Sequence, residues 1–173
     1  MWNSLFNGFG QVNRGELMAA RDGDGWIECT CGSKHWGKHG AAGILLIRNG
    51  EILLQHRAPW VHNGDTWGIP GGARDSHESI VEAAIREAVE ETGINPEDLI
   101  PLTTFTDDHG IWSYSTVIAV ASNKLEAHEL NDESHEVRWV TFDQVERLPL
   151  HPSFAKSWPS LRLAATDAIE RAI

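Results

Sequence analysis

Two apolar runs separated by a tight turn mark the middle of the chain. Residues Ala41 to Arg48 read AAGILLIR and residues Glu51 to Arg57 read EILLQHR, with only Asn49-Gly50 between them. Continuous apolar runs of this length are typical of buried strands, and Asn-Gly between two of them is a strong hairpin signal. The pattern therefore predicts two strands that pair antiparallel.

A helix is predicted in the segment that follows. Ser79 followed by Glu82 is a capping-box signature, and Gly93 is the glycine expected just past a helix end, so about 13 residues are framed between them. Residues at helical spacing within this frame form an apolar stripe that we expect to face the core: Val81, Ile85, Ala88 and Thr92.

The rest of the chain continues with strands and then helices. Residues 100–106 and 112–121 read as β-branched strands joined by a turn at Asp107, Asp108, His109 and Gly110. A strand at 137–140, a helix beginning at Thr141 or Asp143 and an amphipathic helix over 157–173 follow. This order predicts an α/β sandwich, and 173 residues are enough for one core.

The predicted helix carries an unusual concentration of carboxylates. Glu87, Glu90 and Glu91 fall at i, i+3 and i+4, which places three like charges on one helix face. Arg86 alone cannot neutralise them, and Glu78 precedes the helix on a glycine-rich loop. A solvated acidic face is one explanation, and a divalent cation is the other. Magnesium suits the second because it is a hard ion that takes oxygen ligands.

The full spacing of this segment resembles the Nudix box. Gly72, five residues, Glu78, seven residues, and then Arg86-Glu87-Ala88-Val89-Glu90-Glu91-Thr92-Gly93-Ile94 follow its pattern. Ala88 is smaller than the aliphatic residue usual there, which affects packing and not the ligands. The likeness extends over roughly residues 40–150, so the sequence resembles the MutT-like Nudix hydrolase family.

This resemblance implies a fold, a reaction and a set of roles. The fold would be an α/β/α sandwich with a mixed sheet over residues 39–173. The reaction would be Mg2+- or Mn2+-dependent cleavage of the diphosphate linkage in a nucleoside diphosphate derivative, so the partner would be a small-molecule nucleotide. Arg86 would orient a glutamate, and Glu87 is the first candidate for the general base, with Glu133 and Glu136 as alternatives. The implied metal ligands are Gly72 through its carbonyl, Glu78, Glu87, Glu90 and Glu91.

Two rival functions stay open at this point. One is a prenyl-diphosphate isomerase-like enzyme, and the other is a module that binds a nucleotide without cleaving it. The intact box and the four charged residues Arg86, Glu87, Glu90 and Glu91 favour the hydrolase.

Two residues outside the box are candidates for substrate binding. Arg57 ends the second apolar run, where family members often carry a basic residue that faces phosphates; a solvated arginine is the alternative. Trp60 lies on a loop next to a proline and could stack on a nucleobase. Eight tryptophans in the chain weaken that inference.

Residues 1–38 lie outside the resemblance and read as an N-terminal extension. Its aromatic residues could pack on the core or on a partner subunit, which leaves a homodimer open, and residues 15–21 could form a short helix. Cys29, Cys31, His35 and His39 could form a tetrahedral zinc site. The one-residue gap between the cysteines and the lack of a second loop favour a plain turn without zinc.

Charge and composition exclude several classes of protein. Fourteen Lys and Arg against 25 Asp and Glu give a formal charge of −11, which argues against a surface for duplex nucleic acid. No apolar run approaches the ~20 residues of a membrane-spanning helix, and residues 1–10 lack the regions of a signal peptide. Two cysteines are too few for a secreted framework, so we expect a cytoplasmic protein.

Overall fold

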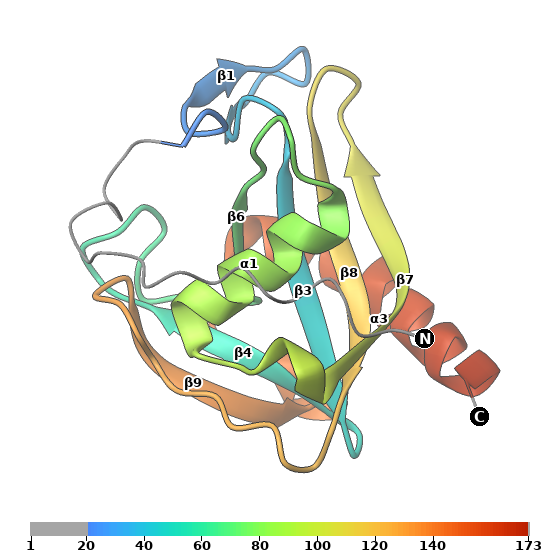
Figure 1. Cartoon of the computed structure of the whole chain (residues 1–173). Helices are drawn as coiled ribbons and strands as arrows, with labels where there is room; N and C mark the ends of the chain where they lie inside the picture. The colour runs from blue at the N-terminus through green and yellow to red at the C-terminus, as the bar shows by residue number, and fades with distance from the viewer. Residues whose placement is uncertain (1–20, 173) are drawn as a thin grey trace, which may run out of the picture.

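A mixed sheet of seven strands forms the centre of the fold. The computed structural model describes residues 21–172, and Figure 1 shows their arrangement. The sheet order is β5-β4-β3-β8-β7, with β6 paired to β3 and β9 paired to β4. In chain order the elements are β1 (Trp26–Glu28), β2 (Lys34–Trp36), β3 (Ala41–Arg48), β4 (Glu51–Arg57), β5 (Trp67–Gly68), β6 (Gly71–Ala73), α1 (Ile80–Thr92), the 3-10 turn η1 (Pro96–Asp98), β7 (Leu99–Asp108), β8 (Ser113–Ala121), β9 (Ser134–Thr141), α2 (Phe142–Val145) and α3 (Pro152–Ala172).

The apolar runs form the strands that their pattern predicts. β3 and β4 have the expected bounds and pair antiparallel next to the Asn49-Gly50 turn, at Ile47 with Ile52 and at Arg48 with Glu51. Beyond these pairs the two strands part. β3 then runs parallel to β8, and β4 pairs with β9 along its length. The mixed α/β fold is thereby confirmed.

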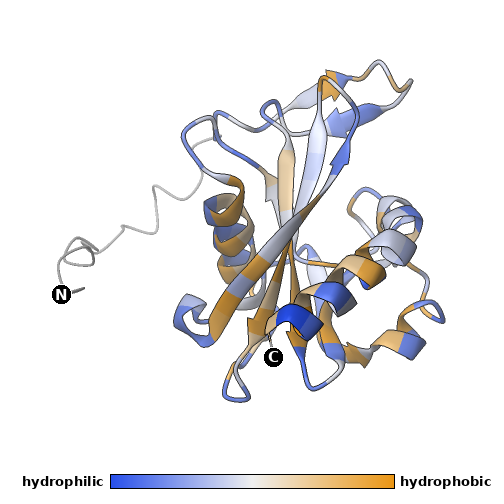
Figure 2. Ribbon diagram, turned by 90° about the vertical axis from the view of Figure 1, so that its right-hand side faces the viewer, coloured by the Kyte–Doolittle hydropathy of each residue, from blue (hydrophilic) through white to orange (hydrophobic). Residues whose placement is uncertain are grey.

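Alternation along the strands divides the core into two layers. From β3, Ile44 and Leu46 face α1, whereas Leu45 and Ile47 face the opposite side, where Trp158 of α3 packs. Figure 2 shows the sheet between the two helices. One face of the sheet is thus fixed by α1 and the other by α3.

Helix α1 begins and ends where its capping residues predict. Ser79 and Glu82 form the reciprocal capping box, and Gly93 closes the helix with φ of 63°. The predicted apolar stripe is only partly correct. Ala88 and Thr92 are buried, and Val81 and Ile85 are half-buried but pack against the same core cluster; the stripe did not include Ala83 and Ala84, which are fully buried in it. Small side chains allow this helix to lie close to the sheet.

Other boundaries differ from the sequence prediction. Asp107 and Asp108 belong to β7 and not to the turn after it, and α3 begins at Pro152 instead of residue 157. Proline is favoured in a first helical turn because its missing N–H has no partner there. The expected arm and the short helix at 15–21 lie outside the described residues, except for residues 21–24. Across residues 21–172, no helix has the length and apolar character needed to cross a bilayer.

A buried tryptophan on α3 provides a test of this packing. Trp158 is 1% exposed, and its indole Nε1 finds no acceptor among the described residues. We expect Trp158→Ala to lower the free energy of unfolding by about 3–5 kcal/mol, because it leaves a large cavity. Trp158→Phe should lower it much less, since it also removes the unpaired donor. Chemical denaturation measures both, and equal losses would contradict this account.

Candidate active site

The carboxylate cluster is assembled by two neighbouring elements. β6 pairs antiparallel with β3, at Gly72 with Ala42 and at Gly71 with Gly43, and this brings the glycine pair against α1. A Cβ atom at position 72 would lie 2.7 Å from the carboxylate carbon of Glu87. Only glycine therefore lets the backbone approach this carboxylate so closely.

Arg86 lies at the centre of the cluster. Its guanidinium donates to both carboxylate oxygens of Glu78, with Nη2 at 2.9 Å from Oε2, and Nη2 also donates to the Ala73 carbonyl at 2.9 Å. Nη1 donates to Glu87 and, at 3.3 Å, to Glu90. One planar donor group thus fixes three of the predicted metal-binding glutamates relative to the loop before the helix.

Glu91 is held by a separate chain of hydrogen bonds. Its Oε2 accepts from the Gly71 backbone N–H at 2.9 Å and from Gln55 Nε2 at 3.1 Å, and Ser134 Oγ donates to Gln55 Oε1 at 3.1 Å. Gln55 and Ser134 are buried residues of β4 and β9. These hydrogen bonds therefore connect the last glutamate of the box to both β4 and β9.

Burial raises the pKa of two of these carboxyl groups. For Glu91 desolvation raises the pKa to about 8, and the charge of Glu87 adds to the rise. Hydrogen bonds from Gly71 and Gln55 and the charge of Arg57 act in the opposite direction. Desolvation also raises the pKa of Glu87, against the opposing effect of Arg86. In contrast, the hydrogen bonds from Arg86 lower the pKa of Glu78.

Two residues that the sequence did not single out belong to this site. Arg21 forms an ion pair with Glu90 and lies 3.7 Å from Asp75, although it is far from both in the sequence. Tyr114 is half-buried with its hydroxyl next to Gly71, and desolvation followed by the charges of Glu91 and Glu87 raises its pKa. No local sequence pattern connects either residue to the box.

The structure locates the two alternative bases differently. Glu133 is exposed and directly precedes β9, next to Ser134, whose side chain donates to Gln55. Glu136 pairs in register with His56, one residue along from the Gln55 position, so its side chain lies on the opposite face from Gln55 and binds Arg138. The structure therefore places Glu136 away from the cluster, whereas Glu133 is one residue from Ser134, which is connected to Glu91 through Gln55.

The two predicted substrate-binding residues lie at the end of β4 and on the loop that follows it. The Arg57 guanidinium donates to the His62 carbonyl, at 3.1 Å from Nη2, and its charge acts on Glu91. Trp60 is 67% exposed and packs edge-on against His135, with ring centroids 5.0 Å apart. It borders an open depression that is also lined by the residues Glu129, Leu130, Asn131, Asp132, Ser134 and His135.

The donor set fits a hard divalent cation. The guanidinium groups of Arg86 and Arg21 contact Glu78, Glu87 and Glu90 but not Glu91, and Arg21 also lies near Asp75. The four glutamates and two arginines therefore carry a formal charge of −2 (−4 + 2) when all are ionised, and Asp75 makes the surroundings more negative still. All side-chain donors in the set are oxygens, as Mg2+ and Mn2+ prefer. The electrostatic demand of the cluster therefore matches one such ion.

The candidate zinc residues are brought together in a different combination from the expected one. Cys29, Cys31 and His35 lie together, but the fourth member is His109 from the turn after β7. His39 lies elsewhere, with its Nε2 3.9 Å from Asp22. The sequence missed His109 because it is 74 residues from His35.

Comparison with known proteins agrees with this site. The sequence model of the NUDIX domain matches residues 37–161. A protein of Mycobacterium tuberculosis named putative 8-oxo-dGTP diphosphatase 3 is 47% identical over 156 residues, which cover 83% of this chain and 70% of that protein. A nucleoside triphosphate pyrophosphatase/Nudix hydrolase fusion protein of Bifidobacterium longum is 44% identical, over 79% of this chain and 30% of the fusion protein.

Solved structures give the same result. The crystal structure of RenU, a Nudix hydrolase from M. smegmatis, superposes with a TM-score of 0.77 at 48% identity, over 84% of this chain and 96% of that one. The binary complex of a C. elegans Ap4A hydrolase, at 22% identity, shares the fold with a TM-score of 0.60, over 73% and 98% of the two chains. With the Nudix box assembled around Arg86 and a domain match over most of its length, the chain belongs to the Nudix hydrolase family.

Proposed function

We propose that this Nudix hydrolase cleaves the diphosphate linkage of a nucleoside diphosphate derivative in a Mg2+- or Mn2+-dependent reaction. The observation that supports this most directly is the net negative carboxylate cluster that Arg86 fixes against Gly72. Relatives named as diphosphatases and pyrophosphatases support the same reaction class. Residues 39–173 form the catalytic domain in this proposal, and residues 1–38 are an extension to it.

The side chains divide the work by position. Gly72, Glu78, Glu87, Glu90 and Glu91 would hold the cation, which would supply Lewis-acid and electrostatic stabilisation of the phosphate charge. Arg86 keeps Glu78 and Glu87 in fixed orientations by donating to both carboxylates. Glu87, whose burial raises its pKa, is the first candidate to accept the proton of the attacking water. Glu133, which directly precedes Ser134, is the alternative.

The substrate would enter from the side of the loop that follows β4. Arg57 offers a guanidinium for phosphate oxygens, and the exposed ring of Trp60 offers a face for a base. An oxidised purine nucleoside triphosphate is the first substrate to test, because the M. tuberculosis relative is named for that activity.

A nucleotide panel tests the reaction class. We expect the purified protein to cleave the diphosphate linkage of at least one of 8-oxo-dGTP, ordinary triphosphates, ADP-ribose, NADH or diadenosine polyphosphates. Chromatography of the products measures this, because a triphosphate gives a shorter nucleotide with phosphate or pyrophosphate, ADP-ribose and NADH give AMP with a second phosphate monoester, and diadenosine polyphosphates give two nucleotides. EDTA should abolish the cleavage, and added Mg2+ or Mn2+ should restore it. Turnover that survives thorough chelation would refute the proposal. Isomerisation of a prenyl diphosphate without phosphate release, or nucleotide binding without turnover, would favour the two rival functions.

Glu91→Gln separates a catalytic role from a structural one. The amide oxygen can still accept from Gly71 and Gln55, so the fold should hold and the melting temperature in EDTA should not fall. The rate should fall by roughly 10²–10³-fold, because a charged metal ligand is lost. Glu170→Gln, an exposed glutamate on α3, is the matched control and should change neither value. Early melting with an unchanged rate would show that Glu91 is structural.

Arg57→Ala tests the phosphate contact. Loss of one charge-assisted hydrogen bond to the substrate should raise KM by roughly tenfold or more and leave kcat less affected. Arg171→Ala removes an arginine that is 83% exposed on α3 and serves as the control. Unchanged steady-state kinetics in Arg57→Ala would assign this arginine to the His62 loop alone.

A further inference from the structure

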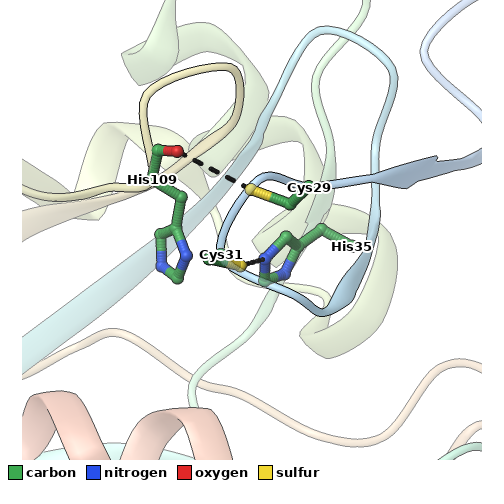
Figure 3. A group of neighbouring side chains, drawn as sticks. All are labelled: Cys29, Cys31, His35 and His109. Carbon is green, nitrogen blue, oxygen red and sulfur yellow. Dashed lines mark hydrogen bonds between the residues drawn. The ribbon is translucent and has the colours of Figure 1, made fainter.

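A second group of metal-binding side chains lies away from the carboxylate cluster. Cys29, Cys31, His35 and His109 each offer one ligand atom, and all four atoms lie within 4.8 Å of one another (Figure 3). They come from two separate parts of the chain, the β1–β2 hairpin and the turn between β7 and β8. The second part supplies the fourth ligand that the hairpin alone does not offer.

The ligand types select the kind of metal. Two thiolates and two imidazoles are the donor set of tetrahedral structural zinc sites, and hard ions such as Mg2+ avoid sulfur. Zinc bond lengths of about 2.0–2.3 Å place neighbouring ligand atoms about 3.5 Å apart. Cys31 Sγ and His35 Nε2 are already 3.1 Å apart. Small side-chain rotations therefore suffice to bring all four atoms onto one ion.

Neighbouring groups already orient both histidines. His109 Nε2 lies 3.2 Å from Asp107 Oδ2, which leaves Nδ1 for a metal. A carboxylate on the second ring nitrogen is the usual partner of a zinc-binding histidine. The His35 ring stacks on Trp112 with centroids 4.0 Å apart and planes 7° apart. Trp112 Nε1 in turn donates to the Gly37 carbonyl at 3.0 Å, so this ring has a fixed position.

The backbone presents the two cysteines from one tight turn. Gly32 N–H donates to the Cys29 carbonyl at 3.0 Å, and Cys29 N–H donates to the Ser33 carbonyl at 2.9 Å. Cys29 is buried against Ala41 and Trp112, and Cys31 is exposed. Both thiols are free.

We propose that Cys29, Cys31, His35 and His109 bind one structural Zn2+ that fastens the β1–β2 hairpin to the β7–β8 hairpin. Figure 1 shows these two hairpins side by side at one end of the sheet. This ion would take no chemical part in the hydrolysis, so the zinc proposal does not rest on the proposed reaction. Two thiolates neutralise the ion and leave the site without net charge.

The hairpin is also connected to the loop that precedes α1. Gly23 N–H donates to Asp75 Oδ1 at 2.9 Å, Ser76 N–H donates to Asp22 Oδ1 at 2.9 Å, and Gly37 N–H donates to the Gly25 carbonyl at 2.8 Å. The same segment carries Arg21, which binds Glu90. Zinc at the β1–β2 hairpin would therefore stabilise the segment that carries Arg21, one of the two arginines that bind the carboxylate cluster.

Elemental analysis of the full chain, purified under reducing conditions without a polyhistidine tag and washed with excess Mg2+, tests the site. We expect about one zinc per chain. Cys31→Ser and His109→Asn should each lose most of it, and His39→Asn should retain it because His39 lies outside the group. Zinc that stays at full stoichiometry in both ligand variants would place the ion elsewhere and overturn the proposal.

Cobalt substitution of the wild-type chain gives a test that does not require any variant to fold. Co2+ bound here should show the visible bands of tetrahedral thiolate ligation, and addition of Zn2+ should remove them. The melting temperature should also rise with one equivalent of Zn2+. The absence of thiolate bands with Co2+ in protein kept reduced throughout would overturn the proposal.

Discussion

The arrangement of the carboxylate cluster depends on one guanidinium group between like charges. Arg86 binds Glu78, Glu87, Glu90 and the Ala73 carbonyl, and its own side chain is only 17% exposed. Without it, three partly buried carboxylates, one before α1 and two in its second half, would repel one another. Lysine could not replace it, because a single ammonium group cannot match this fork of acceptors. The arginine thus stabilises an acidic cluster whose remaining charge suits a cation.

The second constraint is the close approach of α1 to the sheet. Ala83, Ala84 and Ala88 let the helix lie against β3, and the glycine pair of β6 lets Glu87 and Glu91 reach the backbone. Both features place carboxylates in a poorly solvated position, which raises the pKa of Glu91 and Glu87. The same packing that stabilises the fold therefore raises the free energy needed to ionise these two carboxyl groups when no cation is bound.

Local patterns predicted the elements whose causes are local. The bounds of β3, β4 and α1 follow from the Asn49-Gly50 turn, the capping box and Gly93. The spacing of the box also predicted that Arg86 and its glutamates would share one site, and the structure places them together. The roles of these residues in catalysis and metal binding stay predictions.

What the sequence did not predict depends on contacts between distant segments. The apolar stripe with Val81 and Ile85 was predicted from helical spacing alone. That spacing does not show that small side chains are favoured where the helix lies closest to a strand. The face on which Glu136 lies follows from its register with His56, which no local pattern gives. Arg21, Gln55 and Ser134 reach the cluster across 36 residues or more. The pairing of β4 with β9 brings Gln55 and Ser134 together, and the contacts of the segment before β1 with the loop before α1 bring Arg21 there.

The two metal centres that we propose differ in the ions they would select, and this follows from ligand chemistry alone. The carboxylate cluster offers oxygen atoms around a residual negative charge, which a weakly bound Mg2+ that keeps its waters can satisfy. The Cys and His group offers two sulfurs beside Trp112, one of them buried, which suits an ion that gives up its waters. Exchange of ions between the sites is disfavoured, because neither ligand set matches the other ion. A chain with both sites can therefore hold a structural zinc ion and a hard catalytic cation at the same time without either ion displacing the other.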